Sequence, residues 1–130
     1  MAEPTVGLTL FRRNLEINPF IWSVGITPVP KPIGRDLLQG KGVTSFKICN
    51  PNPFWVWYRG WNGSAGDMPA IKEMGHYLAP GATDINRSQV PDWIAAVADD
   101  EPGFPIYDAN GAWLYQGQRT RMVMIYGSGG

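Results

Sequence analysis

The chain has 130 residues, enough to bury about two-thirds of its unfolded surface in one core, so we expect a single domain over residues 1–130 that needs no disulfide or metal. Eleven lysines and arginines balance eleven aspartates and glutamates, which argues against a protein that follows a nucleic-acid backbone. One cysteine excludes an internal disulfide. We see no signal-peptide pattern and no apolar segment of membrane-spanning length, and we expect cytoplasmic synthesis without membrane contact.

Glycine and proline are frequent along the whole chain. Sixteen glycines and twelve prolines leave little room for helices. Six tryptophans, five tyrosines and five phenylalanines favour strands. Together they predict an all-β fold, a β-sandwich or jelly-roll-like domain with seven to nine short strands, at most one short helix, and extended terminal and proline arms.

Strand patterns dominate the first two-thirds of the chain. Alternating apolar and polar side chains, or short apolar runs between turn residues, predict β-strands. The segments with these patterns are residues 5–11, 20–27, 43–49, 54–61 and 71–81. The clearest alternation is in FIWSVGIT, where one face carries Phe20, Trp22, Val24 and Ile26.

The segments between these strands are rich in turn residues. Three prolines at alternate positions in residues 28–33 remove ladder donors and fix φ, so we expect an extended, polyproline-like arm or an edge crossing. We expect turns over residues 34–42, a flexible loop over residues 62–70, and a polar connection over residues 82–89.

Residues 91–98, PDWIAAVA, are the one plausible helix. Pro91 fits the first helical position and Asp92 lies in the first turn. Against the helix, the three acids of residues 99–101 would lie at the negative end of the helix dipole. Another strand is therefore the alternative for this segment.

The C-terminal part predicts a hairpin and a last strand. The Asn110-Gly111 pair accepts positive φ between the apolar runs FPIY and AWLY, which indicates a hairpin. In the strand that begins near residue 119, one face carries Met122, Met124 and Tyr126. We expect residues 127–130 to form a flexible glycine tail.

Residues 50–61, NPNPFWVWYRGW, hold three tryptophans between two prolines and a glycine. In a strand, Phe54, Val56 and Tyr58 share one face. The other face carries Trp55, Trp57, Arg59 and Trp61. Because a solvated sheet face is normally polar, we predict that the first face fills the core while the second meets a neighbouring subunit or covers a terminal arm. Core packing by both faces is the alternative.

The sequence contains no catalytic or metal-binding motif. His76 is the single histidine, so sites that need two imidazoles are impossible, and the glycines form no phosphate-binding motif. We expect Cys49 to be a small buried strand residue rather than a nucleophile paired with His76. Four acids are expected to share one end of the fold as solvated loop residues: Asp99, Asp100, Glu101 and Asp108. We therefore predict no enzyme activity, no cofactor and no metal.

Four motifs in order, NPNPFWVWYRGW, GHYLAPG, VPDWIAAV and EPGFPI, resemble small virion proteins of tailed bacteriophages, in particular capsid decoration or cement proteins that stabilise the head. The likeness spans residues 43–106. It implies a β-sandwich or jelly-roll-like fold, no cofactor, no catalytic residue, and an oligomer, either a dimer or a trimer. The implied partners are the major capsid protein and other copies of the chain, and the implied location is the virion.

Two functions are open at this stage. A decoration protein would dock through the tryptophan-rich outer face, because tryptophan, tyrosine and arginine concentrate in the energetic centres of protein interfaces. Its N-terminal segment, proline arm and glycine tail would reach across subunit boundaries. A carbohydrate-binding or tail receptor-binding module would instead stack sugars on the same tryptophans.

Overall fold

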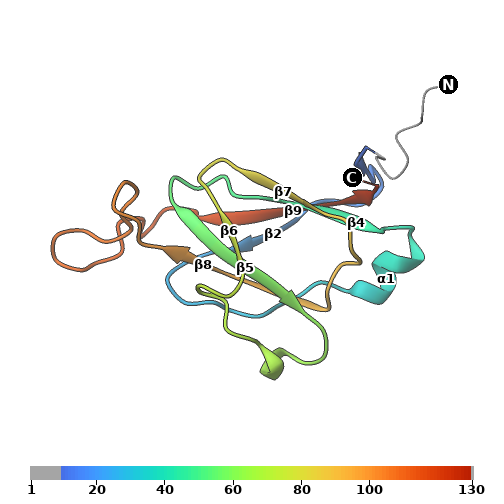
Figure 1. The fold of residues 1–130 in the computed structure, drawn as a ribbon, viewed down its shortest axis with the longest axis horizontal. Helices are drawn as coiled ribbons and strands as arrows, with labels where there is room; N and C mark the ends of the chain where they lie inside the picture. The colour runs from blue at the N-terminus through green and yellow to red at the C-terminus, as the bar shows by residue number, and fades with distance from the viewer. Residues whose placement is uncertain (1–9, 130) are drawn as a thin grey trace.

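A computed structural model describes residues 10–129 of the chain. Within these residues, nine strands form two antiparallel sheets that pack face to face, together with one short helix and one 3-10 turn (Figure 1). The predicted all-β sandwich with a single short helix is therefore confirmed. No helix in the described part of the chain is both long enough and apolar enough to cross a membrane.

The first sheet is built around its longest strand, β9. Its five strands are β1 (Arg12–Arg13), β2 (Phe20–Ser23), β4 (Ser45–Cys49), β7 (Thr83–Asn86) and β9 (Arg121–Ser128). β1 and β2 pair with one edge of β9, β4 pairs with the other edge, and β7 pairs with β4. The three side chains predicted to share a face of β9 are all buried. The sequence pattern thus identified the central strand correctly.

The second sheet is built around one long pair of strands. Its four strands are β3 (Lys31–Pro32), β5 (Trp55–Trp61), β6 (His76–Leu78) and β8 (Trp93–Asp99). Their order across the sheet is β3, β8, β5, β6. β5 and β8 pair along their whole length, whereas β6 pairs only with residues 56–58. Within the described residues, the last part of β5 therefore has no partner strand on its β6 side.

The core lies between the two sheets and is filled by the inward side chains of their central strands. Ile48, Val56 and Met124 are fully enclosed, with no exposed surface. Enclosing a side chain of this size stabilises a fold by about 1.5–3 kcal/mol. Phe54 extends the core beyond β5, where its ring contacts Trp113 with 5.5 Å between ring centroids.

The NPNP segment carries the chain from the first sheet to the second. Its two prolines are exposed and its two asparagines are buried. Asn50 Nδ2 donates to the backbone oxygens of Phe54 and Leu78 at 2.9 and 3.1 Å. Asn52 pairs with the backbone of Arg121, donating to its oxygen at 2.8 Å and accepting from its nitrogen at 3.0 Å. Because an unpaired buried backbone group costs about 1–3 kcal/mol, these amides fix the start of β5.

The helix lies where turns were expected, so that prediction is wrong. α1 (Arg35–Gly40) follows Gly34, whose φ of 81° sets the turn into the helix. Leu38 is buried in the core. One helical turn anchored by one leucine has too few apolar positions to give a helical pattern in the sequence.

Of the two alternatives for residues 91–98, the strand is correct, because β8 occupies most of this segment. β8 is buried on both faces: Ile94 faces the core, and Ala95 belongs to a second cluster outside it. A strand covered on both sides is a continuous apolar run, which mimics a helical cluster. The expected polar connection over residues 82–89 is also wrong, since it contains β7, an edge strand whose alternate side chains are exposed.

The two expected arms belong to the sheets. Residues 28–33 make the edge crossing that was one of two alternatives, because β3 pairs with β8 at the sheet edge, where proline is tolerated. The glycine tail is shorter than predicted: Gly127 is a buried part of β9, and a Cβ there would lie 2.2 Å from the oxygen of Arg12. Only glycine fits at position 127, because the backbone of β1 lies this close to it. Most of the strand expected over residues 5–11 lies outside the described residues.

Candidate functional site

β5 divides its side chains between two faces as predicted. Val56 and Tyr58 are buried between the sheets, together with Phe54 just before the strand. On the opposite face, all four predicted contact residues are half-buried: Trp55, Trp57, Arg59 and Trp61. They lie outside the central core. The central core is therefore filled by one face of this strand only.

The first half of the outer face is an aromatic ladder, the stacked rings of Trp55, Tyr77 and Trp57. Tyr77 lies opposite Trp57 across the β5–β6 pair. Its ring stacks on Trp57 with 4.0 Å between centroids and on Trp55 with 4.5 Å. Stacked aromatic pairs contribute about 0.5–1.5 kcal/mol beyond the area they bury. No local pattern indicated Tyr77, because β6, the strand that carries it, is short and its register with β5 cannot be read from the sequence.

Two carboxylates hold the hydroxyl of Tyr77. The hydroxyl donates to Asp99 Oδ2 at 2.5 Å and also bonds the carboxylate of Glu101. Burial and these two acceptors raise the pKa of Tyr77 well above its usual range, so the phenol stays neutral. The ladder therefore has an uncharged aromatic body and an acidic rim.

The second half of the outer face is covered by the loop that follows β5. Trp57 and Trp61 pack there against a second small core. That core consists of Ile71, Ala95 and Val97, with Met68 at its edge. The small side chains of β8 leave room for the indole rings above them. This half of the face is therefore closed by the chain itself.

Hydrogen bonds fasten the same loop to the strand. Trp61 Nε1 donates to the oxygen of Ser64 at 2.9 Å, and Arg59 Nη1 donates to the oxygen of Ala70 at 3.2 Å. The loop contains a 3-10 turn closed by Ser64 and Asp67. The Ser64 backbone N–H, with the Ser64 hydroxyl, lowers the pKa of Asp67. The expected flexible loop is therefore a hydrogen-bonded segment that contains a 3-10 turn. Arg59 and Trp61 contact this segment and not a terminal arm.

The connection between β8 and β9, residues 100–120, projects beyond the sheets at one end of the sandwich (Figure 1). We call it the projecting loop. Ile106 anchors it in the core, and its N–H donates to Asp100 Oδ1 at 3.0 Å. Three apolar side chains of the loop are exposed: Phe104, Tyr107 and Leu114. Apolar side chains held outward on an anchored loop are candidates for contact with a partner.

The projecting loop begins beside the aromatic ladder. β8 ends at Asp99, which lies opposite Trp55. Two residues further, Glu101 bonds Tyr77 and bridges to Phe104. The Trp55 end of the ladder and the projecting loop are therefore neighbours, and we call them together the contact surface. The predicted hairpin within the loop is reduced to one bridge, between Tyr107 and Trp113.

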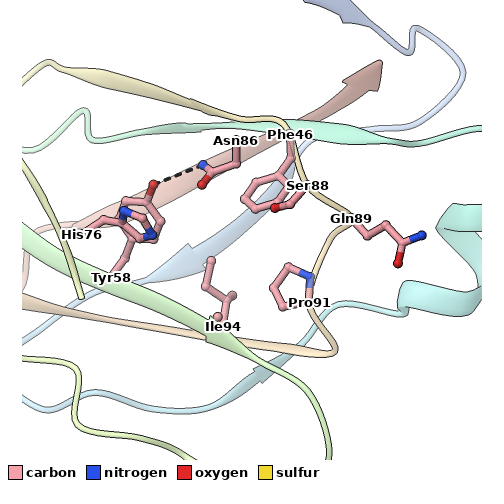
Figure 2. Close-up of a pocket in the computed structure, with 9 residues that line it drawn as sticks. Phe46, Tyr58, His76, Asn86, Ser88, Gln89, Pro91 and Ile94 are labelled. Carbon is pink, nitrogen blue, oxygen red and sulfur yellow. Dashed lines mark hydrogen bonds between the residues drawn. The ribbon is translucent and has the colours of Figure 1, made fainter. Parts of the chain in front are cut away.

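A cavity of about 150 Å³ lies between the two sheets, at the side where β6 ends (Figure 2). Its walls come from both sheets and from the β7–β8 connection. They are formed by Phe46, Tyr58, Gly60, His76, Asn86, Ser88, Gln89, Pro91 and Ile94. Burial raises the pKa of Tyr58 well above its usual range, so its hydroxyl stays protonated. The sequence did not predict this cavity, since its residues come from four stretches that are far apart in the chain.

Cys49 and His76 do not form a catalytic pair. His76 is exposed on β6 and stacks on Tyr58 with 5.0 Å between centroids. Cys49 lies on β4 in the other sheet and is half-buried, not buried as expected. Of the four acids expected to gather at one end, Asp99 and Glu101 meet at Tyr77. Within residues 10–129 no group of three or more histidine, cysteine, aspartate or glutamate side chains is placed to hold a metal ion.

Comparisons with protein-family models, with curated proteins and with solved structures find no match to this chain. The function is therefore argued from the geometry of the contact surface and of the cavity.

Proposed function

We propose that this protein is a structural virion protein, which binds the outer capsid lattice as a decoration or cement protein and stabilises it. The observation that carries the proposal is the contact surface. It joins the Trp55 end of the ladder to the exposed apolar side chains of the projecting loop. Aromatic side chains bury large areas with few rotatable bonds, which makes them the usual anchors of protein interfaces.

The chemistry of this surface fits a protein partner. The ladder offers ring edges and faces, and the two carboxylates at its rim share the single hydroxyl proton of Tyr77, so they keep acceptor sites for donors of a partner. Phe104 and Leu114 add apolar area beyond the sheets. A stable contact buries about 800 Å² per partner, and a lattice that repeats a modest contact makes binding avid. The partners that we propose are the major capsid protein and other copies of this chain.

The arms have a smaller part in this proposal than the sequence indicated. The proline-rich segment pairs with β8, and Gly127 pairs within the first sheet. Both segments are used inside the domain. The contact surface, rather than these segments, is therefore the part of the described chain that we propose meets the capsid.

Co-sedimentation with capsids prepared without the protein tests the proposal. We expect saturable binding by the wild type. Replacing Trp55 by alanine should weaken binding by about 2 kcal/mol, or roughly 30-fold, because it removes the outermost ring of the ladder. Leu37→Ala is the matched control, since Leu37 is an exposed apolar residue on α1. A monodisperse monomer that leaves these capsids unbound contradicts the proposal, as does equal weakening by both variants.

Sugar stacking on the same tryptophans is the rival function. Trp55 and Trp57 both stack on Tyr77, so one face of each indole is already in contact with a tyrosine and is closed to a sugar. We therefore expect tryptophan fluorescence to stay constant when neutral sugars are added. A saturable change in emission that disappears in Trp55→Ala would support the rival.

A further inference from the structure

The cavity between the sheets exists because β6 is short. β6 pairs with residues 56–58 and leaves the end of β5 open on that side. Gly60, in the open part of β5, lines the cavity, and a Cβ there would lie 2.4 Å from Pro91 Cγ. The absence of a side chain at Gly60 lets the β7–β8 connection close over this end. The opening is therefore a product of strand pairing, not a packing fault.

The cavity has a polar rim, which makes up the larger part of its surface, and a smaller apolar part. Figure 2 shows Phe46 and Ile94 entering from the two sheets, with Pro91 at one side. At the other side Asn86 Nδ2 donates to the hydroxyl of Tyr58 at 3.2 Å, which in turn donates to Asp84 at 3.1 Å. A ligand would therefore meet mainly hydrogen-bonding groups, with a smaller apolar area beside them.

The polar rim has groups left for a ligand. The amide oxygen of Asn86 makes no hydrogen bond within residues 10–129 and is turned toward the cavity, as is the hydroxyl of Ser88 (Figure 2). His76 stands at the entrance, where it is exposed. A hydroxyl both donates and accepts, an imidazole does the same, and an amide oxygen accepts. The rim matches a ligand with several hydroxyl groups.

No acid, lysine or arginine is among the residues that line the cavity. The nearest charges are already engaged, since Arg35 donates to Gln89 at 2.8 Å and Asp84 accepts from Tyr58 at 3.1 Å. A charged ligand would lose hydration there without a free counter-charge, which is unfavourable. An aromatic hydrocarbon would leave the rim groups without partners, which is also unfavourable. The volume of about 150 Å³ admits one six-membered ring, comparable to the cavities that bind benzene.

We infer that this cavity binds one uncharged, hydroxylated six-membered ring, the chemistry of a single neutral pyranose. Asn86, Ser88 and His76 bond the hydroxyls of the ring, and the smaller apolar area contacts its C–H groups. The site lies between the sheets and is separate from the contact surface, so it goes beyond the proposed structural role. The ring is either a free monosaccharide or the end of a glycan that enters through the opening.

Titration of ¹⁵N-labelled full-length protein with neutral monosaccharides, followed by NMR, tests this inference. We expect saturable shifts at Gly60 and at the side-chain amide of Asn86 for at least one neutral sugar. Glucuronate, which carries a charge, should cause none. If a methyl glycoside binds as well as the free sugar, the ligand is the end of a glycan. If methylation abolishes binding, the ligand is a free monosaccharide. Both of these results support the inference.

Two variants locate the binding. Ser88→Phe fills the opening at an exposed position, so the fold is kept and sugar affinity should fall more than tenfold. His76→Ala removes one bonding group and should reduce affinity roughly tenfold. The matched control is Ser23→Phe, the same change at an exposed serine of β2, which should bind as the wild type does.

Four results would overturn the inference. They are no shift with any neutral sugar, shifts centred on the indoles of the aromatic ladder, binding of phenol in place of sugars, and unchanged affinity in Ser88→Phe. The amide spectrum of each variant confirms that its fold is intact before its affinity is compared.

Discussion

The two ends of the outer face of β5 carry the same residue type and have different surroundings. At one end, Trp61 packs on a second small core and donates to Ser64, so the chain covers its own indole. At the other end, Trp55 stacks on Tyr77 and lies beside the projecting loop. The difference teaches that a tryptophan row in a strand need not act as one unit. One half stabilises the domain, and the other half is the part that we propose meets a partner.

The different surroundings follow from what each end of β5 is paired with. The Trp61 end lies opposite Trp93, and the loop after β5 turns back over both, with Trp93 Nε1 donating to the oxygen of Gly63. The Trp55 end lies opposite Asp99, where β8 stops and the chain leaves the sheet. The points at which β5 and β8 end therefore determine that a loop covers the Trp61 end and that the chain leaves the sheet at the Trp55 end.

The largest expected effect tests what holds the Trp55 end in place. Asn52→Ala should lower the free energy of unfolding by about 4 kcal/mol, because it removes a buried side chain and leaves the partly buried backbone N–H and oxygen of Arg121 without these partners. Urea unfolding followed by circular dichroism measures this loss. Asn18→Ala is the control, since Asn18 is exposed. A loss below about 1 kcal/mol would indicate that the ladder, not the asparagines, fixes this end.

The next effect compares the two ends directly. Trp61→Ala should lower the free energy of unfolding by about 3 kcal/mol, since it removes packing on the second core and a hydrogen bond to Ser64. Trp55→Ala should lower it by about 1 kcal/mol, mainly the stacking on Tyr77. The same urea experiment measures both. Equal losses would mean that the two ends do not differ in the isolated domain.

Sequence reasoning predicted the sandwich and the division of β5 because both depend on alternation. Val56 and Tyr58 are buried while Trp55 and Trp57 are not, and the period of two along a strand requires this once one face is in the core. The buried face of β9 was predicted on the same ground. Local pattern is sufficient where a strand has one buried face.

Features that depend on pairing between distant segments were not predictable. Tyr77 joins the ladder through the register of β6 with β5. The asparagines of the NPNP segment bond both sheets, and no local pattern indicates this. β8 was ambiguous because burial on both faces removes the alternation that distinguishes a strand from a helix. The cavity needs the missing continuation of β6, which no local pattern encodes.

Stability at alkaline pH tests the hydrogen bonds that Tyr77 makes in the ladder. Its pKa is raised in the folded state above the ordinary value of 10.0, so above about pH 10 the unfolded chain loses a proton that the folded chain keeps. Stability is therefore constant below this pH and falls as pH rises beyond it. Tyr58 and Tyr126 act in the same direction, since burial raises the pKa of Tyr126 to about 12.

Tyr77→Phe should reduce the slope with which the free energy of unfolding falls above about pH 10, by up to the contribution of one proton. Urea unfolding at a series of pH values measures this slope. Tyr107→Phe, on the projecting loop, is the matched control. An unchanged slope in Tyr77→Phe would contradict the hydrogen bonds of its hydroxyl to Asp99 and Glu101.

The smallest effect on stability belongs to the projecting loop. Phe104 is 43% exposed, so Phe104→Ala should change the free energy of unfolding by less than about 0.5 kcal/mol. If the Trp55 end and this loop form one contact surface, the same variant should weaken capsid co-sedimentation by about 1 kcal/mol, roughly fivefold, because the ring is desolvated only in the complex. If Phe104→Ala keeps full stability and still weakens co-sedimentation, Phe104 acts in partner contact and not in folding. Unchanged assembly in Phe104→Ala, with a loss in Trp55→Ala, would confine the contact to the ladder.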